Sequence, residues 1–242
     1  MNDLIPNGPE LPLGLTHFIT QADALALGVL GLLLVMSVAS WTQILAKSWA
    51  AWRRRRRSRA FLIGFRERAS VTAADLAPLA QRPSEPFARL ALAGLSAQAG
   101  LHPLSDPAAP GRDTPIVRAL VQTIAHETIR LESGLTLLAS IASTAPFVGL
   151  FGTVWGIYHA LLGIGRAGQG SLDQVAGPVG EALIMTGLGL AVAIPAVLAY
   201  NAFNRGNRVL IDRLEGFAHD LLSFLAGHVR DAGAGVAVAE AG

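Results

Sequence analysis

Three long stretches without a charged residue dominate the chain, and each is long enough to cross a bilayer. They occupy residues 24–46, residues 133–165 and the segment between Glu181 and Arg205. A helix rises about 1.5 Å per residue and the hydrocarbon core of a bilayer is about 30 Å thick, so about 20 apolar residues suffice. The pattern predicts an all-α integral membrane protein with three transmembrane helices, at 24–46, 133–165 and 178–204.

The polar segments show helical spacing of hydrophobic residues and no strand-like alternation. Proline-rich turns divide residues 47–132 into helical pieces, one expected at Phe87 to Ala99 and another beginning at Pro115. The second of these repeats apolar residues at Ile116, Leu120, Ile124 and Ile129. The segment after the third span repeats them at Leu210, Leu214, Phe217, Leu221 and Leu225. We therefore predict a helical cytoplasmic domain over 47–132 and a cytoplasmic C-terminal helix and tail over 205–242.

Two of the transmembrane helices are expected to extend far beyond the bilayer. The charge-free interval 133–165 holds 33 residues, which is about 50 Å of helix and more than a hydrocarbon core needs. The helix begun near Pro115 is predicted to run straight into this span. The third helix is predicted to continue past residue 204 in the same way.

The distribution of basic residues predicts the orientation. Of 19 basic residues, 18 lie in 47–132 and 205–242, and the exception is Arg166. Basic residues next to a span face the cytoplasm, so residues 1–23 form a periplasmic N-terminal segment and 166–177 a periplasmic turn. The run Arg53, Arg54, Arg55, Arg56 and Arg57 follows the first span. Such a run is typical of an anchor for anionic lipid headgroups; we do not expect nucleic-acid binding.

Overall composition agrees with a membrane protein, because 52% of the residues are hydrophobic and only 15% are charged. Against that background Glu181 is the one acid within the three predicted spans. A carboxylate in hydrocarbon is costly unless it is protonated, paired or hydrated, and such acids usually belong to an ion or proton path. Glu181 is therefore the leading candidate for function.

Hydroxyl and small residues mark one side of the second span. Thr136, Ser143, Pro146 and Thr153 fall within about 100° of arc at 100° per residue, and Gly149 and Gly156 flank them. Gly152 and Gly156 have the Gly-x-x-x-Gly spacing that allows close helix contact. In the third span, Thr186 lies about 140° around the helix from Glu181. Both cannot face one axis unless Pro178 or Pro195 distorts the helix.

Several sequence patterns resemble enzyme motifs, but their surroundings do not fit the corresponding sites. Residues 163–168 match the glycine pattern of dinucleotide-binding folds, but no strand precedes them. Lys47 is the single lysine and lies in no phosphate-binding loop, and His126-Glu127 lacks a second histidine one turn later. With no cysteine and no nearby second histidine, His159 is expected to be a hydrogen-bonded packing residue. We expect no enzymatic activity, cofactor or metal.

Residues 143–157 and 180–201 carry a family resemblance. With the three-span layout and a large loop, they resemble the ExbB/TolQ/MotA family of proton-driven inner-membrane motors, most closely its ExbB members. The resemblance implies a homopentamer around a pore that holds the membrane helices of an ExbD partner. TonB would then pass energy to outer-membrane import of iron-siderophore complexes and cobalamin.

The resemblance also implies roles for single residues. Glu181 matches the family's membrane acid, and Thr153 and Thr186 match the hydroxyls near the partner's aspartate. Pro146, Gly149, Gly152, Gly156 and Pro195 would pack the helices near the pore. TolQ members share much of this sequence, so a TolQ-like role in the Tol-Pal system is the first alternative. A passive membrane scaffold is the second.

Overall fold

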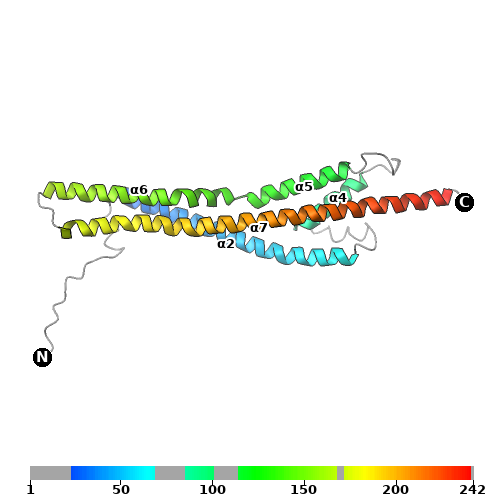
Figure 1. The fold of residues 1–242 in the computed structure, drawn as a ribbon, viewed down its shortest axis with the longest axis horizontal. Helices are drawn as coiled ribbons and strands as arrows, with labels where there is room; N and C mark the ends of the chain where they lie inside the picture. Colours follow the sequence, from blue (N-terminus) through cyan, green and yellow to red (C-terminus); the bar gives the residue numbers. More distant parts are fainter. Residues whose placement is uncertain (1–22, 69–84, 101–113, 168–171, 241–242) are drawn as a thin grey trace, which may run out of the picture. The chain divides into compact units, whose positions relative to one another are not determined.

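The computed structural model describes residues 23–68, 85–100, 114–167 and 172–240, and within these ranges it contains helices and no strand (Figure 1). The helices are α2 (Ala24–Arg68), α4 (Pro86–Ala99), α5 (Thr114–Glu132), α6 (Leu135–Ala167) and α7 (Leu172–Glu240). Among the described residues, three segments are long and apolar enough to cross a membrane: Ala24–Ile63, Pro115–Gly165 and Gly177–Leu225. The predicted all-α class with three membrane-crossing helices is confirmed.

The contacts divide the chain into two compact units. Unit 1 comprises Met1–Ile44 and Thr136–Asn201, and unit 2 comprises Leu45–Leu135 and Ala202–Gly242. The helices α2 and α7 each contribute one part to unit 1 and another part to unit 2. Each unit is described by itself below.

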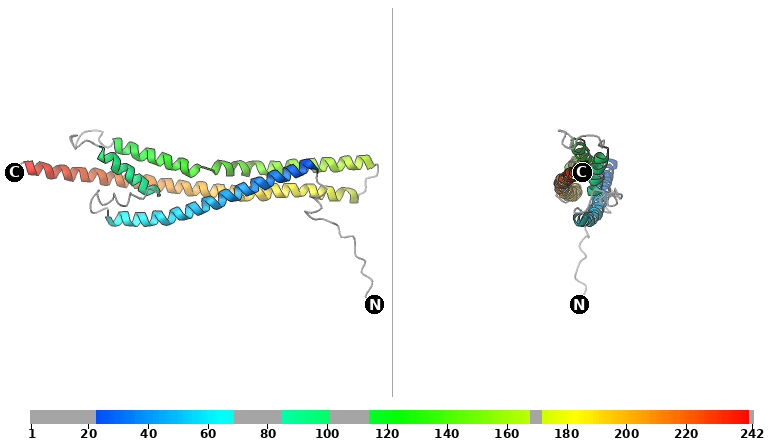
Figure 2. Two further views of the ribbon diagram at one scale, coloured as in Figure 1. Left: turned by 180° about the vertical axis from the view of Figure 1, so that it is seen from behind. Right: turned by 90° about the vertical axis from the view of Figure 1, so that its right-hand side faces the viewer.

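Unit 1 packs its parts of α2, α6 and α7 side by side around a small core (Figure 2). The buried members of this core are Val29, Leu33, Ala145, Met185 and Ala193. Many large apolar side chains of the same helices point outward instead, and Phe147 of α6 is 71% exposed. Such an apolar exterior is what lipid or a neighbouring apolar helix would cover.

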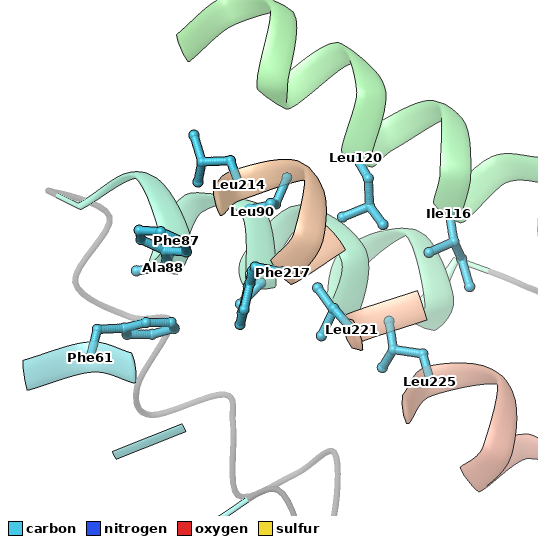
Figure 3. Packing of buried hydrophobic residues seen from close by; sticks show 11 residues of the cluster. Phe61, Phe87, Ala88, Leu90, Ile116, Leu120, Leu214, Phe217, Leu221 and Leu225 are labelled. Carbon is cyan, nitrogen blue, oxygen red and sulfur yellow. The ribbon is translucent and has the colours of Figure 1, made fainter. Parts of the chain in front are cut away.

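Unit 2 has a larger core built from aromatic and leucine side chains (Figure 3). Phe217 of α7 makes T-shaped contacts with the rings of Phe61 of α2 and Phe87 of α4, with centroid distances of 6.1 Å and 5.5 Å. T-shaped contacts of this kind add to the stabilisation from burial. The predicted apolar face of α7 is confirmed, because Leu214, Phe217, Leu221 and Leu225 are buried and Leu210 packs against them.

The prediction of one unbroken helix from Pro115 into the second span is wrong at Ser133 and Gly134. These two residues form a turn between α5 and α6, and Gly134 has φ 76. Glycine adopts this left-handed conformation without a steric penalty and therefore ends helices readily. The Leu131 carbonyl oxygen near the end of α5 accepts hydrogen bonds from Lys47 Nζ and Asn207 Nδ2, each at 3.1 Å.

Two further details differ from the sequence prediction. Ile129 is 66% exposed, whereas the buried face of α5 includes Ile116, Leu120, Glu127 and Leu131. At 100° per residue Ile129 lies about 220° from Ile116, so it cannot share that face.

The predicted turn at 166–177 is also too long, because α6 ends at Ala167 and α7 already begins at Leu172. Pro178 lies inside α7, as apolar spans tolerate. The N-terminal segment up to residue 22 lies outside the described residues.

Candidate functional site: a close contact between α6 and α7

The α6 and α7 backbones meet at Gly149 and Gly189. A Cβ atom built on Gly149 would lie 2.6 Å from the Met185 carbonyl oxygen, and one built on Gly189 would lie 2.7 Å from the Ala145 carbonyl oxygen. No side chain fits at such distances, so both positions require glycine at this approach. Close backbone contact is the way helices associate in lipid, where burial of apolar surface gives little driving force.

The contact continues along α6 at Gly152 and Gly156, about one and two turns beyond Gly149. A Cβ on Gly156 would lie 2.8 Å from Ala182 Cβ, and a Cβ on Gly152 would lie 2.9 Å from Met185 Cε. Val29 of α2 also borders Gly152, with its Cγ1 atom 3.2 Å from that Cβ position. The predicted Gly-x-x-x-Gly pair thus lies where α6 faces α7, and Gly152 also touches α2.

Thr153 and Thr186 form a hydroxyl pair within this contact. Their Oγ1 atoms are 2.5 Å apart, and Thr153 Oγ1 also lies 3.0 Å from the Ala182 carbonyl oxygen and 3.2 Å from that of Gly149. Thr153 is only 5% exposed. A hydroxyl has one hydrogen to donate. When Thr153 donates to a carbonyl, Thr186 donates to Thr153, and the Thr186 oxygen keeps lone pairs that can accept from another group.

Glu181 lies in the third turn of α7, nine residues or about 14 Å from the start of the helix at Leu172. Its side chain is half-buried, and it directly precedes Ala182, whose carbonyl accepts from Thr153. Pro146 and Pro195 are also half-buried, inside α6 and α7 respectively. The α6–α7 contact therefore brings Thr153 and Thr186 together, with Glu181 five residues before Thr186 on the same helix.

The five consecutive arginines of α2 do not share one environment. Arg53, Arg55, Arg56 and Arg57 are exposed, and the Arg56 guanidinium stacks 4.2 Å from the ring centroid of Trp52. Arg54 is half-buried and lies within electrostatic range of Glu127 and Arg89. Four of the five side chains are therefore exposed, while Arg54 is half-buried within unit 2.

His159 is engaged at both ring nitrogens. Nδ1 lies 3.1 Å from the Trp155 carbonyl oxygen and Nε2 lies 3.5 Å from Asp23 Oδ2. The ring also packs on the Trp155 indole, with a centroid distance of 4.4 Å. These contacts match the expected hydrogen-bonded packing residue. No group of three or more histidine, cysteine or acidic side chains able to hold a metal occurs among the residues that the structure describes.

Sequence reasoning missed two features. Gly189 was one glycine of many in the third span, and only its approach to Gly149 sets it apart. Glu127 is buried at 4% exposure, and its carboxylate accepts hydrogen bonds from the Arg89 guanidinium, at 2.7 Å from Nε, and from Arg130 at 3.3 Å. The sequence did hold a signal for this ion pair: Glu127 has the helical spacing of the buried face of α5, and Arg89 lies on α4.

Comparison with known proteins gives a consistent assignment. Residues 83–216 match the MotA/TolQ/ExbB proton channel family. The chain is 42% identical over 234 residues to the biopolymer transport protein ExbB of Xanthomonas campestris pv. campestris, covering 91% of this chain and 92% of that protein. It is 40% identical over 205 residues to ExbB of Neisseria meningitidis, covering 83% of this chain and 92% of that protein.

A TolQ protein matches over a shorter part of the chain. The Tol-Pal system protein TolQ of Pseudomonas aeruginosa is 44% identical over 110 residues, which is 46% of this chain and 48% of that protein. The two ExbB matches described above extend along most of the chain, whereas this TolQ match does not. The chain belongs to the MotA/TolQ/ExbB proton channel family.

Proposed function

We propose that the chain is an ExbB-like subunit of an inner-membrane motor driven by the proton motive force. With an ExbD-like partner and TonB it would power import through outer-membrane receptors, including import of iron-siderophore complexes and cobalamin. Similarity to ExbB proteins along 91% of the chain carries this proposal. The hydroxyl pair Thr153–Thr186, near Glu181 in a membrane-crossing helix, supports it.

In the proposed assembly, five copies surround a pore that receives the single membrane helix of each ExbD-like partner. The N-terminus is periplasmic and the C-terminus cytoplasmic, as the basic residues of 47–132 and 205–242 favour. The exposed arginines near Trp52 anchor the chain to anionic headgroups at the cytoplasmic surface. The outward-facing apolar residues of unit 1 contact lipid or the next subunit.

The hydroxyl pair can hydrogen-bond a partner carboxyl in both of its protonation states, which suits a site beside a proton path. With Thr153 donating to a main-chain carbonyl and Thr186 donating to Thr153, the Thr186 oxygen accepts from a protonated acid. Reversal of the hydroxyl orientations offers a donor to the ionised acid. Each proton that crosses 100 mV releases about 2.3 kcal/mol, and Glu181 is the ionisable group of this region that we assign to the path.

Glu181→Gln tests the proposal, because it keeps the size of the side chain and removes its charge. A proton-coupled subunit is expected to assemble and to lose energy-dependent uptake, whereas a passive scaffold would assemble and keep it. Glu215→Gln is the matched control, an exposed acid of α7 in unit 2. Uptake of a labelled siderophore and the size of the purified complex are the two readouts. Unchanged uptake in Glu181→Gln with normal assembly would refute the assignment.

The TolQ-like alternative rests on the TolQ match over 110 residues. Complementation separates the two roles. Restoration of siderophore uptake in a strain lacking ExbB supports the proposal, and restoration of envelope integrity alone in a strain lacking TolQ supports the alternative.

A further inference from the structure

His159 of α6 and Asp23, at the start of α2, form a contact within unit 1 that the proposed function does not use. The imidazole Nε2 atom lies 3.5 Å from Asp23 Oδ2. Asp23 immediately precedes α2, and its backbone carbonyl accepts a hydrogen bond from the Leu27 N–H at 3.0 Å. The contact therefore joins the first turn of α2 to the side of α6.

Both nitrogens of the His159 ring lie next to an acceptor oxygen. Nδ1 is 3.1 Å from the Trp155 carbonyl oxygen, and Nε2 is the atom beside the Asp23 carboxylate. A neutral imidazole has one N–H and one lone pair, so either tautomer sets a lone pair against one of these two oxygens. The imidazolium form has an N–H on each nitrogen and donates to both. The two contacts together fit the charged ring.

The aromatic neighbour of His159 also suits a positive charge. The centroid of the imidazole ring lies 4.4 Å from that of the Trp155 indole. An indole ring attracts a cation held within about 6 Å of its centroid. This ring contact therefore favours the same charged form as the two oxygens do.

We propose that His159 is a pH-sensitive latch: its protonated ring binds Asp23 and holds the start of α2 against α6, and loss of the proton releases α2. A histidine exchanges its proton between about pH 5 and 8, a range in which an ordinary aspartate carboxyl is already ionised. The latch is therefore closed near pH 5 and opens as the pH rises. The orientation proposed above would expose it to periplasmic pH, and this assignment to one side rests on the proposed function.

Tyr158 and Glu181 are further titratable groups around His159. Tyr158 adjoins it on α6, with ring centroids 5.4 Å apart, and a tyrosine hydroxyl ordinarily keeps its proton up to about pH 10. On α7, Ala182 packs against Gly156, and Glu181 belongs to that turn. Glu181 is therefore the group whose titration has to be separated from that of His159.

Hydrogen exchange of the full chain in lipid nanodiscs tests the proposal, with the backbone amides of residues 24–30 as the readout. After correction for the intrinsic pH dependence of exchange, their protection should fall about two- to fivefold between about pH 5 and pH 8, as expected for loss of an exposed ion pair. His159→Gln cannot carry the charge. Asp23→Asn removes the partner charge, and asparagine suits the position before a helix as well as aspartate does. Both variants should give a flat profile.

His126→Gln is the matched control, because His126 is an exposed histidine of α5 in unit 2, and it should keep the wild-type profile. Glu181→Gln should keep it as well. A flat wild-type profile, or the wild-type profile in His159→Gln or Asp23→Asn, would overturn the proposal. A flat profile in Glu181→Gln would assign the titration to Glu181 and overturn it too. Exchange at α2 is measured without uptake, so the latch and the proposed function can fail separately.

Discussion

The two units stabilise their helices by opposite means. Unit 1 has a small core in which glycines bring the α6 and α7 backbones together, and a hydroxyl pair lies in the contact. Unit 2 buries phenylalanine and leucine side chains and one ion-paired acid. Burial of large apolar groups is favourable from water but gives little from lipid, where close packing and hydrogen bonds remain. The difference is what the proposed division into a membrane part and an aqueous part requires.

The largest effect is expected from Phe217→Ala in unit 2. Phe217 is 6% exposed and contacts two other aromatic rings, so its removal should lower the free energy of unfolding by about 3–5 kcal/mol. Phe147→Ala, at a 71% exposed position of unit 1, is the control and should cost much less. Denaturant unfolding of both purified variants, monitored by hydrogen exchange, measures the difference in their free energies of unfolding. Equal losses would contradict the contrast between the units.

A smaller effect is expected from Gly149→Ala in unit 1. The added Cβ would lie 2.6 Å from a backbone oxygen of α7, so the helices must separate, at a cost of about 1–3 kcal/mol. Gly187→Ala is the matched control, because its Cβ meets no atom within 4 Å and alanine favours helix. Thermal stability in lipid nanodiscs should fall for the first variant and not for the second. The same fall in both would show that backbone approach does not matter here.

The smallest effect on stability is expected from Thr153→Val. The substitution keeps the side-chain shape and removes the bonds to Thr186 and Ala182, which should cost about 1 kcal/mol. Under the proposed function, uptake should fall far more than stability, and Thr153→Ser should restore it. Thr144→Val is the control, since that exposed hydroxyl bonds only within α6, to the Ser140 carbonyl. Normal uptake in Thr153→Val would exclude the hydroxyl pair from the proton path.

Some of these features could be predicted from the spacing of residues in the sequence, and others could not. The three spans and the buried face of α7 follow from runs and periods of apolar residues, which depend only on local sequence. The pairing of Thr153 with Thr186, and of Gly149 with Gly189, depends on how α6 and α7 are placed in register against each other. Periodicity within one helix does not define that register.

The errors have local causes. Ile129 was placed on the buried face by approximate spacing, although Glu127 occupies that face because Arg89 compensates its charge. The break at Gly134 was overlooked because a single glycine does not by itself end a helix.

The hydrogen bond from Lys47 to the Leu131 carbonyl makes the chain convenient for chemical labelling. Because Lys47 is the single lysine, an acylating reagent can modify one side-chain amine in the chain. The reactivity of this amine reports whether Lys47 of α2 is still bonded to the end of α5. The extent of acylation in intact cells therefore measures how often this hydrogen bond is open.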